Sequence, residues 1–235
     1  MKYSIRVNEV KDSERQNAEN PSHLRGFATL VFGNDFKVTN IAILESSEGK
    51  LFVSMPRYKS SERDESGSVV YKDVCNPITK EFREELYDNI LATYEKAKDS
   101  ERGEEIINQD EKGLPEFSVS VTPFEREGSN VRGLARIYFG DCFIVNNVSI
   151  LSGKENSLFV AMPSYKTKQI AENNKPIYQD ICYPVTKEFR EKLYTGIVNE
   201  YEQAREKNQN RERENTGIQV NVPDKQQDRE ATPFR

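Results

Sequence analysis

The sequence predicts an α+β protein built from two homologous domains, each a meander of antiparallel strands followed by one amphipathic helix. Three observations predict this fold: an internal repeat, strand-like alternation early in each repeat, and a helical apolar stripe at its end. A run of strands followed by a single helix is typical of a helix laid across one face of a sheet.

The repeat relates residues 25–97 to residues 132–204 at a constant offset of 107, and 35 of these 73 positions are identical. Upstream, residues 3–7 align with 117–121 at an offset of 114, so the first copy carries seven extra residues. They fall in the polar stretch 11–23, where a surface loop tolerates insertion. We expect copy one at 1–99, an acidic solvated linker at 100–116, copy two at 117–207 and a polar, disordered tail at 208–235.

Each copy presents its strand signals in the same order. The strands of copy one are expected at 3–7, 26–32, 36–44, 51–55 and 69–75. Those of copy two are expected at 117–121, 133–139, 143–151, 158–162 and 177–182. Short Gly/Asn/Asp segments at 33–35 and 140–142 predict hairpin turns. Pro56 and Pro163 end the fourth strand, and a polar loop is expected after each.

The last element of each copy is predicted to be a helix. Thr79 and Thr186 are expected N-caps, with Glu81 and Glu188 in the first turn. Apolar residues then recur four apart and form one stripe per helix. The stripes are Phe82, Leu86, Ile90 and Tyr94 in copy one, and Phe189, Leu193, Ile197 and Tyr201 in copy two.

The composition excludes several classes of protein. The formal net charge is -5, so neither copy is the broadly basic body of a strong sequence-independent nucleic-acid binder. Three cysteines without a C-x-x-C pair predict no disulfide framework and suit a reduced setting. No stretch approaches about 18 consecutive apolar residues, and the polar start is unlike a signal peptide. We therefore expect a cytoplasmic protein without a membrane span.

Few residues suit catalysis. The single histidine, His23, lies in the insertion and has no counterpart in copy two. No Gly-rich phosphate loop and no metal-ligand spacing occurs, so we expect no catalytic residue, cofactor or metal. Cys75 and Cys182 occupy equivalent strand ends and are expected to be buried, and whether they approach each other across a two-fold interface stays open. Cys142 lies in a turn and is expected to be exposed.

Basic residues with a neighbouring tyrosine follow the Met-Pro pair of each copy, and further basic residues begin each helix. Such groups suit a nucleic-acid backbone with a stacked base, and free N–H groups at a helix start bind anions. The alternative is a solvated surface of mixed charge, since carboxylates crowd the copy-one loop while only Glu172 opposes the copy-two lysines. The candidate binding residues are Arg57, Tyr58, Lys59, Lys80, Arg83, Tyr165, Lys166, Lys168, Lys187 and Arg190.

The motifs of both copies resemble a known family. Each copy has a Leu-Phe-Val strand ended by Met55-Pro56 or Met162-Pro163, a polar loop, Tyr-x-Asp-(Val/Ile)-Cys-x-Pro-(Val/Ile)-Thr and a final helix. This arrangement is similar to the SpoVG family (stage V sporulation protein G, septation regulators), over both copies nearly end to end. The resemblance implies bacterial cytoplasmic domains that dimerise, are linked to sporulation, septation and gene-expression control, and in several members bind DNA or RNA.

A tandem chain of dimerising domains can form the same interface within itself. A 17-residue linker gives the second copy an effective concentration of order millimolar. We therefore expect an intramolecular pseudo-dimer and a monomeric chain. The leading hypothesis is a non-enzymatic regulator that binds DNA or RNA. The alternative is a protein-interaction module that acts on division or sporulation without nucleic acid, and the sequence leaves this choice open.

Overall fold

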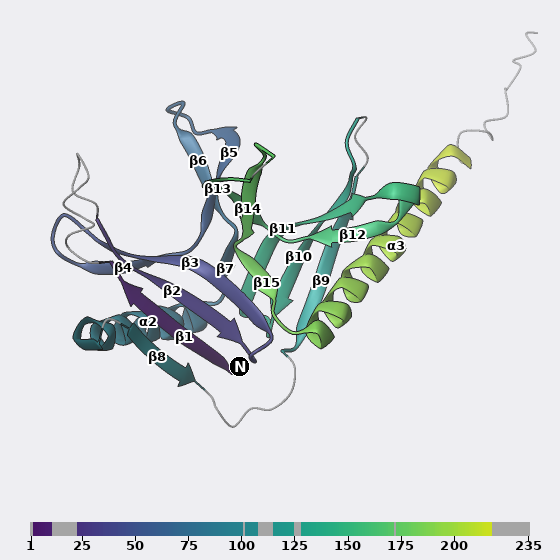
Figure 1. Ribbon diagram of the computed structural model, residues 1–235. Coiled ribbons are helices and arrows are strands. Elements are labelled where there is room, and N and C mark those ends of the chain that lie inside the picture. The colour runs from purple at the N-terminus through teal and green to yellow at the C-terminus, as the bar shows by residue number, and fades with distance from the viewer. Residues whose placement is uncertain are drawn as a thin grey trace, which may run out of the picture.

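The computed structural model describes residues 2–10, 23–100, 102–107, 115–124, 128–171 and 173–217. It confirms the α+β fold, because each copy forms an antiparallel sheet with one helix along it (Figure 1). Of the expected insertion at 11–23, only His23 is described, and it is exposed. The end of the expected tail, 218–235, also lies outside the described residues.

The elements of the two copies occur in the same order, and copy two has one addition, the short helix η1. Copy one contains β1 (Tyr3–Glu9), β2 (Leu24–Phe32), β3 (Phe36–Glu45), β4 (Leu51–Ser54), β5 (Arg57–Arg63), β6 (Val69–Asp73), β7 (Cys75–Pro77) and α2 (Lys80–Ser100). Then β8 (Arg102–Ile107) precedes copy two. Copy two contains β9 (Phe117–Pro123), β10 (Val131–Phe139), β11 (Phe143–Ser152), the short helix η1 (Lys154–Asn156), β12 (Leu158–Ala161), β13 (Ser164–Ile170), β14 (Pro176–Asp180), β15 (Cys182–Pro184) and α3 (Lys187–Gly217).

The predicted turns and helix caps are present. Gly33 (φ 56°) and Asn34 (φ 66°) adopt the left-handed backbone that a tight hairpin turn needs, and Gly140 and Asp141 repeat it. The Thr79 hydroxyl accepts the Phe82 backbone N–H at 3.3 Å, as an N-cap does, and Thr186 caps α3 in the same way. The apolar stripe of each helix is buried against its sheet.

The two copies exchange a strand. β7 leaves copy one and pairs with β11 of copy two, while β15 of copy two pairs with β3 of copy one. The exchange continues beyond the strands, since the Ile78 N–H donates to the Cys142 carbonyl at 2.8 Å and the Val185 N–H donates to the Asp35 carbonyl at 2.7 Å. This reciprocity confirms the expected intramolecular pseudo-dimer.

Aromatic side chains fill the interface between the copies. Phe32 and Phe139 stack with ring centroids 5.5 Å apart, and Phe36 lies 4.7 Å from Phe139. Phe143 lies 5.0 Å from Phe32. All four rings are completely buried, and a single apolar core extends through both copies.

The segment expected to be a solvated linker contains a strand. β8 pairs with the outer edge of β1 and extends the copy-one sheet, because its acidic residues find cations there. Glu104 pairs with Arg6 at 2.9 Å, and Glu105 pairs with Lys96 of α2 at 2.8 Å. Gly103 lets β8 pass close beneath α2, since a Cβ there would overlap the Thr93 carbonyl oxygen.

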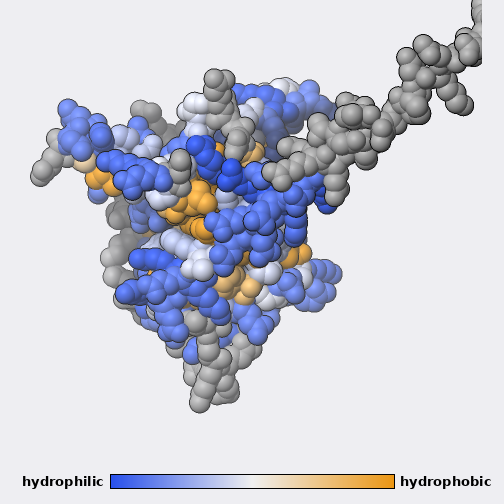
Figure 2. All heavy atoms as spheres, turned by 90° about the vertical axis from the view of Figure 1, so that its right-hand side faces the viewer, coloured by the Kyte–Doolittle hydropathy of each residue, from blue (hydrophilic) through white to orange (hydrophobic). Residues whose placement is uncertain are grey.

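Two further expectations differ from the structure. The polar stretch after each Met-Pro pair begins with a strand, β5 or β13, rather than a loop, and this strand pairs with β6 or β14. The strands expected at 69–75 and 177–182 are present but divided, into β6 and β7 and into β14 and β15. α3 continues to Gly217, so the first ten residues of the expected tail are helical. Residues 205–211 of α3 are exposed, and the side of the molecule shown in Figure 2 is mostly hydrophilic with small apolar areas. None of the described helices is long and apolar enough to cross a membrane.

Candidate nucleic-acid interface

The two hairpins after the Met-Pro pairs rise beside each other from the body of the molecule (Figure 1). Each hairpin begins where a proline ends the preceding strand, and one backbone hydrogen bond joins the two strands at its base. The Val74 N–H donates to the Pro56 carbonyl at 2.8 Å, and the Ile181 N–H donates to the Pro163 carbonyl at 2.8 Å. The strand exchange that follows brings the two hairpins to the pseudo-two-fold axis.

A depression of about 600 Å³ lies between the hairpin bases. Arg57 and Tyr58 of β5 line it from copy one, and Ser164 and Tyr165 of β13 line it from copy two. Tyr58 is half-buried against the core, whereas 36% of Tyr165 is exposed and its hydroxyl donates to Gln179 Oε1 at 2.9 Å. Three of the predicted residues therefore come together, from two copies.

Three of the predicted lysines, Lys59, Lys166 and Lys168, lie on the hairpin strands, and the first two are each opposite a tyrosine. Lys59 pairs across the hairpin with Tyr71, and Lys166 pairs with Tyr178, so each lysine and its tyrosine share one face. Tyr71 is 58% exposed and Tyr178 is 60% exposed. Sequence reasoning did not select these tyrosines, although the repeated Tyr-x-Asp was a signal, because it placed the lysines in a loop without a cross-strand register.

The hairpins differ in charge. In copy one, Lys72 forms an ion pair with Glu62, and Asp64 at the tip accepts hydrogen bonds from Ser66 and Ser68. In copy two, the lysines have no carboxylate partner among the described residues, and Glu172 lies outside them. These lysines are Lys166, Lys168 and Lys175. The copy-two hairpin is therefore the more basic surface.

The predicted residues at the helix starts are partly engaged in the fold. Arg83 donates to the Pro77 carbonyl at 3.1 Å and Arg190 to the Pro184 carbonyl at 3.3 Å, so each fastens an exchanged strand to its helix. Burial raises the pKa of the Asp73 carboxyl, while Arg57 and Arg83 beside it act in the opposite direction. The lysines at these helix starts are highly exposed and lie near carboxylates one turn along, at 3.7 Å from Glu84 and from Glu191.

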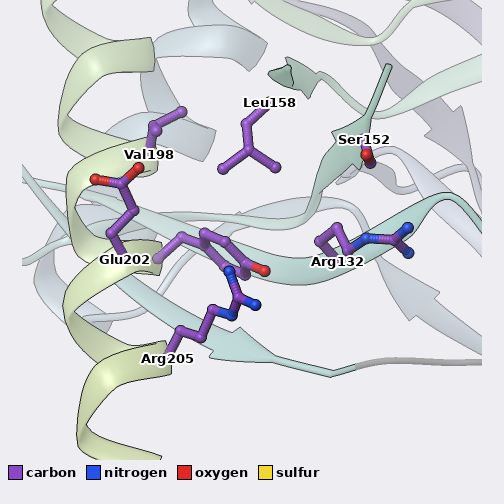
Figure 3. A pocket seen from close by; sticks show the side chains of 7 residues that line it. Arg132, Ser152, Leu158, Val198, Glu202 and Arg205 are labelled. Carbon is purple, nitrogen blue, oxygen red and sulfur yellow. The ribbon is translucent and has the colours of Figure 1, made fainter. Parts of the chain in front are cut away.

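A second pocket, of about 550 Å³, lies between α3 and the copy-two sheet (Figure 3). Ser152, which lines it, stands where Glu45 pairs with Arg25 in copy one. Arg132 donates instead to the Ser129 carbonyl at 2.8 Å. The guanidinium groups of Arg132 and Arg205 do not point toward one another in Figure 3, so they form no clamp around a single anion.

The cysteines divide into two buried thiols and one half-buried thiol. Cys75 and Cys182 are completely buried free thiols, which confirms the predicted burial. This burial raises the pKa of both thiols. Cys142, expected to be exposed, is half-buried because its side chain packs on the core, and its thiol donates to the Phe139 carbonyl. The described residues contain no cluster of ligands for a metal ion.

These environments predict thiol reactivity. In the folded chain, a thiol reagent at pH 8 is expected to modify Cys142 alone and slowly, because burial raises its pKa too. All three thiols are expected to react after unfolding, which a colorimetric count would measure. Prompt reaction of Cys75 in the native chain would contradict the buried placement.

Comparison with known proteins agrees with this duplicated architecture. The SpoVG family model matches the chain twice, over residues 2–96 and 115–203. The chain belongs to the SpoVG family. The two matches cover the two copies and together span most of the sequence.

The curated SpoVG relatives each correspond to about one copy. A Phytoplasma australiense protein is 40% identical over 74 residues, which are 32% of this chain and 70% of that protein. A Caldanaerobacter subterraneus protein is 34% identical over 94 residues, or 40% of this chain and 94% of that protein. One from Treponema denticola is 35% identical over 75 residues, or 32% and 73%. All three carry the provisional name septation protein SpoVG.

Proposed function

We propose that this SpoVG chain is a non-enzymatic regulator of septation that binds single-stranded nucleic acid through the β13–β14 hairpin. The names of the relatives support the process. The observation that supports the ligand is the exposed pair formed by Lys166 and Tyr178 across this hairpin. A cation beside an exposed ring fits a phosphate next to a stacked base.

Single strands suit the hairpin better than a duplex. Stacking on a tyrosine requires an unpaired base, and the Tyr178 ring of the hairpin is exposed enough to receive one. Lys166 lies opposite the Tyr178 ring and Lys168 lies two residues further along β13. Tyr165 lies at the hairpin base, in the depression shared with Tyr58. In this proposal the copy-one hairpin is an auxiliary surface, since Lys72 is paired with Glu62 and further carboxylates, Asp64 and Glu65, lie at its tip.

Removing the copy-two lysines is expected to weaken binding. Lys166→Ala with Lys168→Ala should lower the affinity for labelled single-stranded RNA or DNA about tenfold, and reduce the salt slope of log K by about 1.4. Fluorescence anisotropy at low and physiological salt would measure both. The matched change in copy one, Lys59→Ala with Arg63→Ala, is the control and should cost less than half as much. No binding by the unaltered chain at low salt would reject nucleic acid as the ligand, and equal losses would reject the assignment to copy two.

Removing the ring tests stacking separately from charge. Tyr178→Ala is expected to cost about 1–3 kcal/mol of binding free energy with an unchanged salt slope, because no phosphate contact is lost. Tyr178→Phe should retain most of the affinity, and Tyr71→Ala in copy one should change it little. A Tyr178→Ala protein that binds as well as the unaltered chain would show that this ring is not a stacking platform.

The alternative, a protein-interaction module, is favoured by the outer edge of β9 in copy two, with which none of the described strands pairs.

A further inference from the structure

The two copies differ at the outer edge of the sheet. In copy one, β8 pairs along β1 from Tyr3 to Asn8. The equivalent strand in copy two, β9, is the last strand of its sheet, and none of the described strands pairs with its outer edge. Figure 1 shows β8 beside β1 and the corresponding place beside β9 without a strand. Among the residues that the structure describes, the fold therefore contains one filled and one unfilled version of the same strand site.

The unfilled site leaves apolar surface exposed. Tyr3, Ile5 and Val7 of β1 are at most 1% exposed beneath β8, whereas their counterparts in β9 are only half-buried. Those counterparts are Phe117, Val119 and Val121. β9 also has no charged residue, and charges are the usual protection of a free strand edge. An edge of this kind favours pairing with a further strand.

A second copy of the chain does not fit at this edge. α2 lies over the seam between β1 and β8, where Thr93 and Lys96 contact Glu105. α3 overhangs β9 in the same way, with Gly196 and Lys192 against the Phe117 ring. If two β9 strands paired about a two-fold axis, both α3 helices would have to lie over the same seam. The site therefore admits a strand that brings no helix of its own.

The side chains beside the site define its occupant. In copy one, the β8 residues that face α2 are Gly103 beside Val7, Glu105 beside Ile5 and Ile107 beside Tyr3. The carboxylate of Glu105 is held by Lys96 and Thr93. In copy two these helix positions are Gln203 and Glu200.

At the middle position of the site the helix therefore supplies an acidic residue where copy one supplies a lysine, while Lys192 lies at the Phe117 end. Glu200 is half-buried and forms no ion pair with any residue that the structure describes. A strand bound at this edge provides an ion-pair partner for the Glu200 carboxylate by placing a cation at the position that Glu105 occupies in copy one.

We propose that the free edge of β9 binds an extended segment of a partner protein whose inward residues are, in order, small, basic and aliphatic. The segment runs antiparallel to β9, with the small residue beside Val121, the basic residue beside Glu200 and the aliphatic residue against Phe117. Main-chain hydrogen bonds to β9 supply affinity and these three positions supply selectivity. This activity is separate from nucleic-acid binding, because the hairpins take no part in it.

Two peptides derived from β8 test the proposal. One has the sequence of residues 101–108 with Glu105→Lys, and the control has the unaltered sequence. Added to isotope-labelled full-length chain, the Lys peptide is expected to shift the amide resonances of β9 and to bind about tenfold more tightly than the control. The resident β8 keeps the copy-one site filled, because its effective concentration exceeds that of free peptide.

Glu200→Lys in the chain is expected to reverse this preference, so that the unaltered peptide binds more tightly. Absence of β9 shifts at millimolar Lys peptide, or the same preference in both proteins, would overturn the proposal. So would slow hydrogen exchange of the β9 edge amides in the peptide-free chain, since the edge would then be filled by the chain itself.

Discussion

The Phe139→Ala protein is expected to lose about 3–5 kcal/mol of unfolding free energy, the cost of removing a fully buried aromatic ring. Phe139 is completely buried and contacts rings from both copies, with centroid distances of 5.5 Å to Phe32, 4.7 Å to Phe36 and 6.3 Å to Phe189. The cavity would lie where exchanged strands hold both backbones, so neither copy can collapse freely into it. Urea denaturation followed by circular dichroism would measure the loss.

The same experiment tests whether the copies unfold as one unit. Because the core is continuous and each sheet contains a strand from the other copy, we expect one cooperative transition before and after the change. Phe159→Ala is the control in copy two: this ring is 45% exposed, so its removal should cost less than about 0.5 kcal/mol. Two separate transitions, or a loss below about 1 kcal/mol for Phe139→Ala, would show that the aromatic cluster does not couple the copies.

Much of the fold follows from local sequence. Glycine with Asn34 or Asp141 identifies the hairpin turns, and threonine followed by an apolar stripe identifies each helix, because a few neighbouring side chains determine these features. The partners of the exchanged strands could not be predicted in this way. β7 and β15 are three residues long, and their buried–half-buried–buried pattern suits any sheet edge.

The residues of the candidate site were predicted in part, whereas the strand pairing that arranges them was not. Arg57, Tyr58 and Tyr165 were selected from the basic-aromatic pattern, and the structure brings them to one depression. The hairpin strands themselves show no apolar alternation, because both their faces are largely solvated, so the pairing of Lys166 with Tyr178 could not be read from periodicity. β8 was not predicted as a strand, because its acidic composition indicates a solvated linker. The cations that pair with its carboxylates, Arg6 and Lys96, are identified only by the structure.

A side chain at Gly103 is expected to displace β8 and expose the edge of β1. In the Gly103→Val protein the new Cβ would overlap the Thr93 carbonyl oxygen, which belongs to the helix backbone and cannot move aside as a side chain does. The expected loss is about 1–3 kcal/mol of unfolding free energy, from overpacking or from release of the strand. Hydrogen exchange separates these two results, because release would speed exchange of the β1 edge amides while leaving those between β2 and β3 slow.

The control is Gly196→Ala in α3, where a Cβ would make an ordinary 3.4 Å contact with Phe117. Alanine favours a helix over glycine, so this change should be neutral or should stabilise by up to about 1 kcal/mol. If Gly103→Val leaves both stability and β1 exchange unchanged, β8 is not held beneath α2. If β1 exchange rises to the rate of β9, the two edges are equivalent once β8 is gone, which is the relation on which the β9 docking site depends.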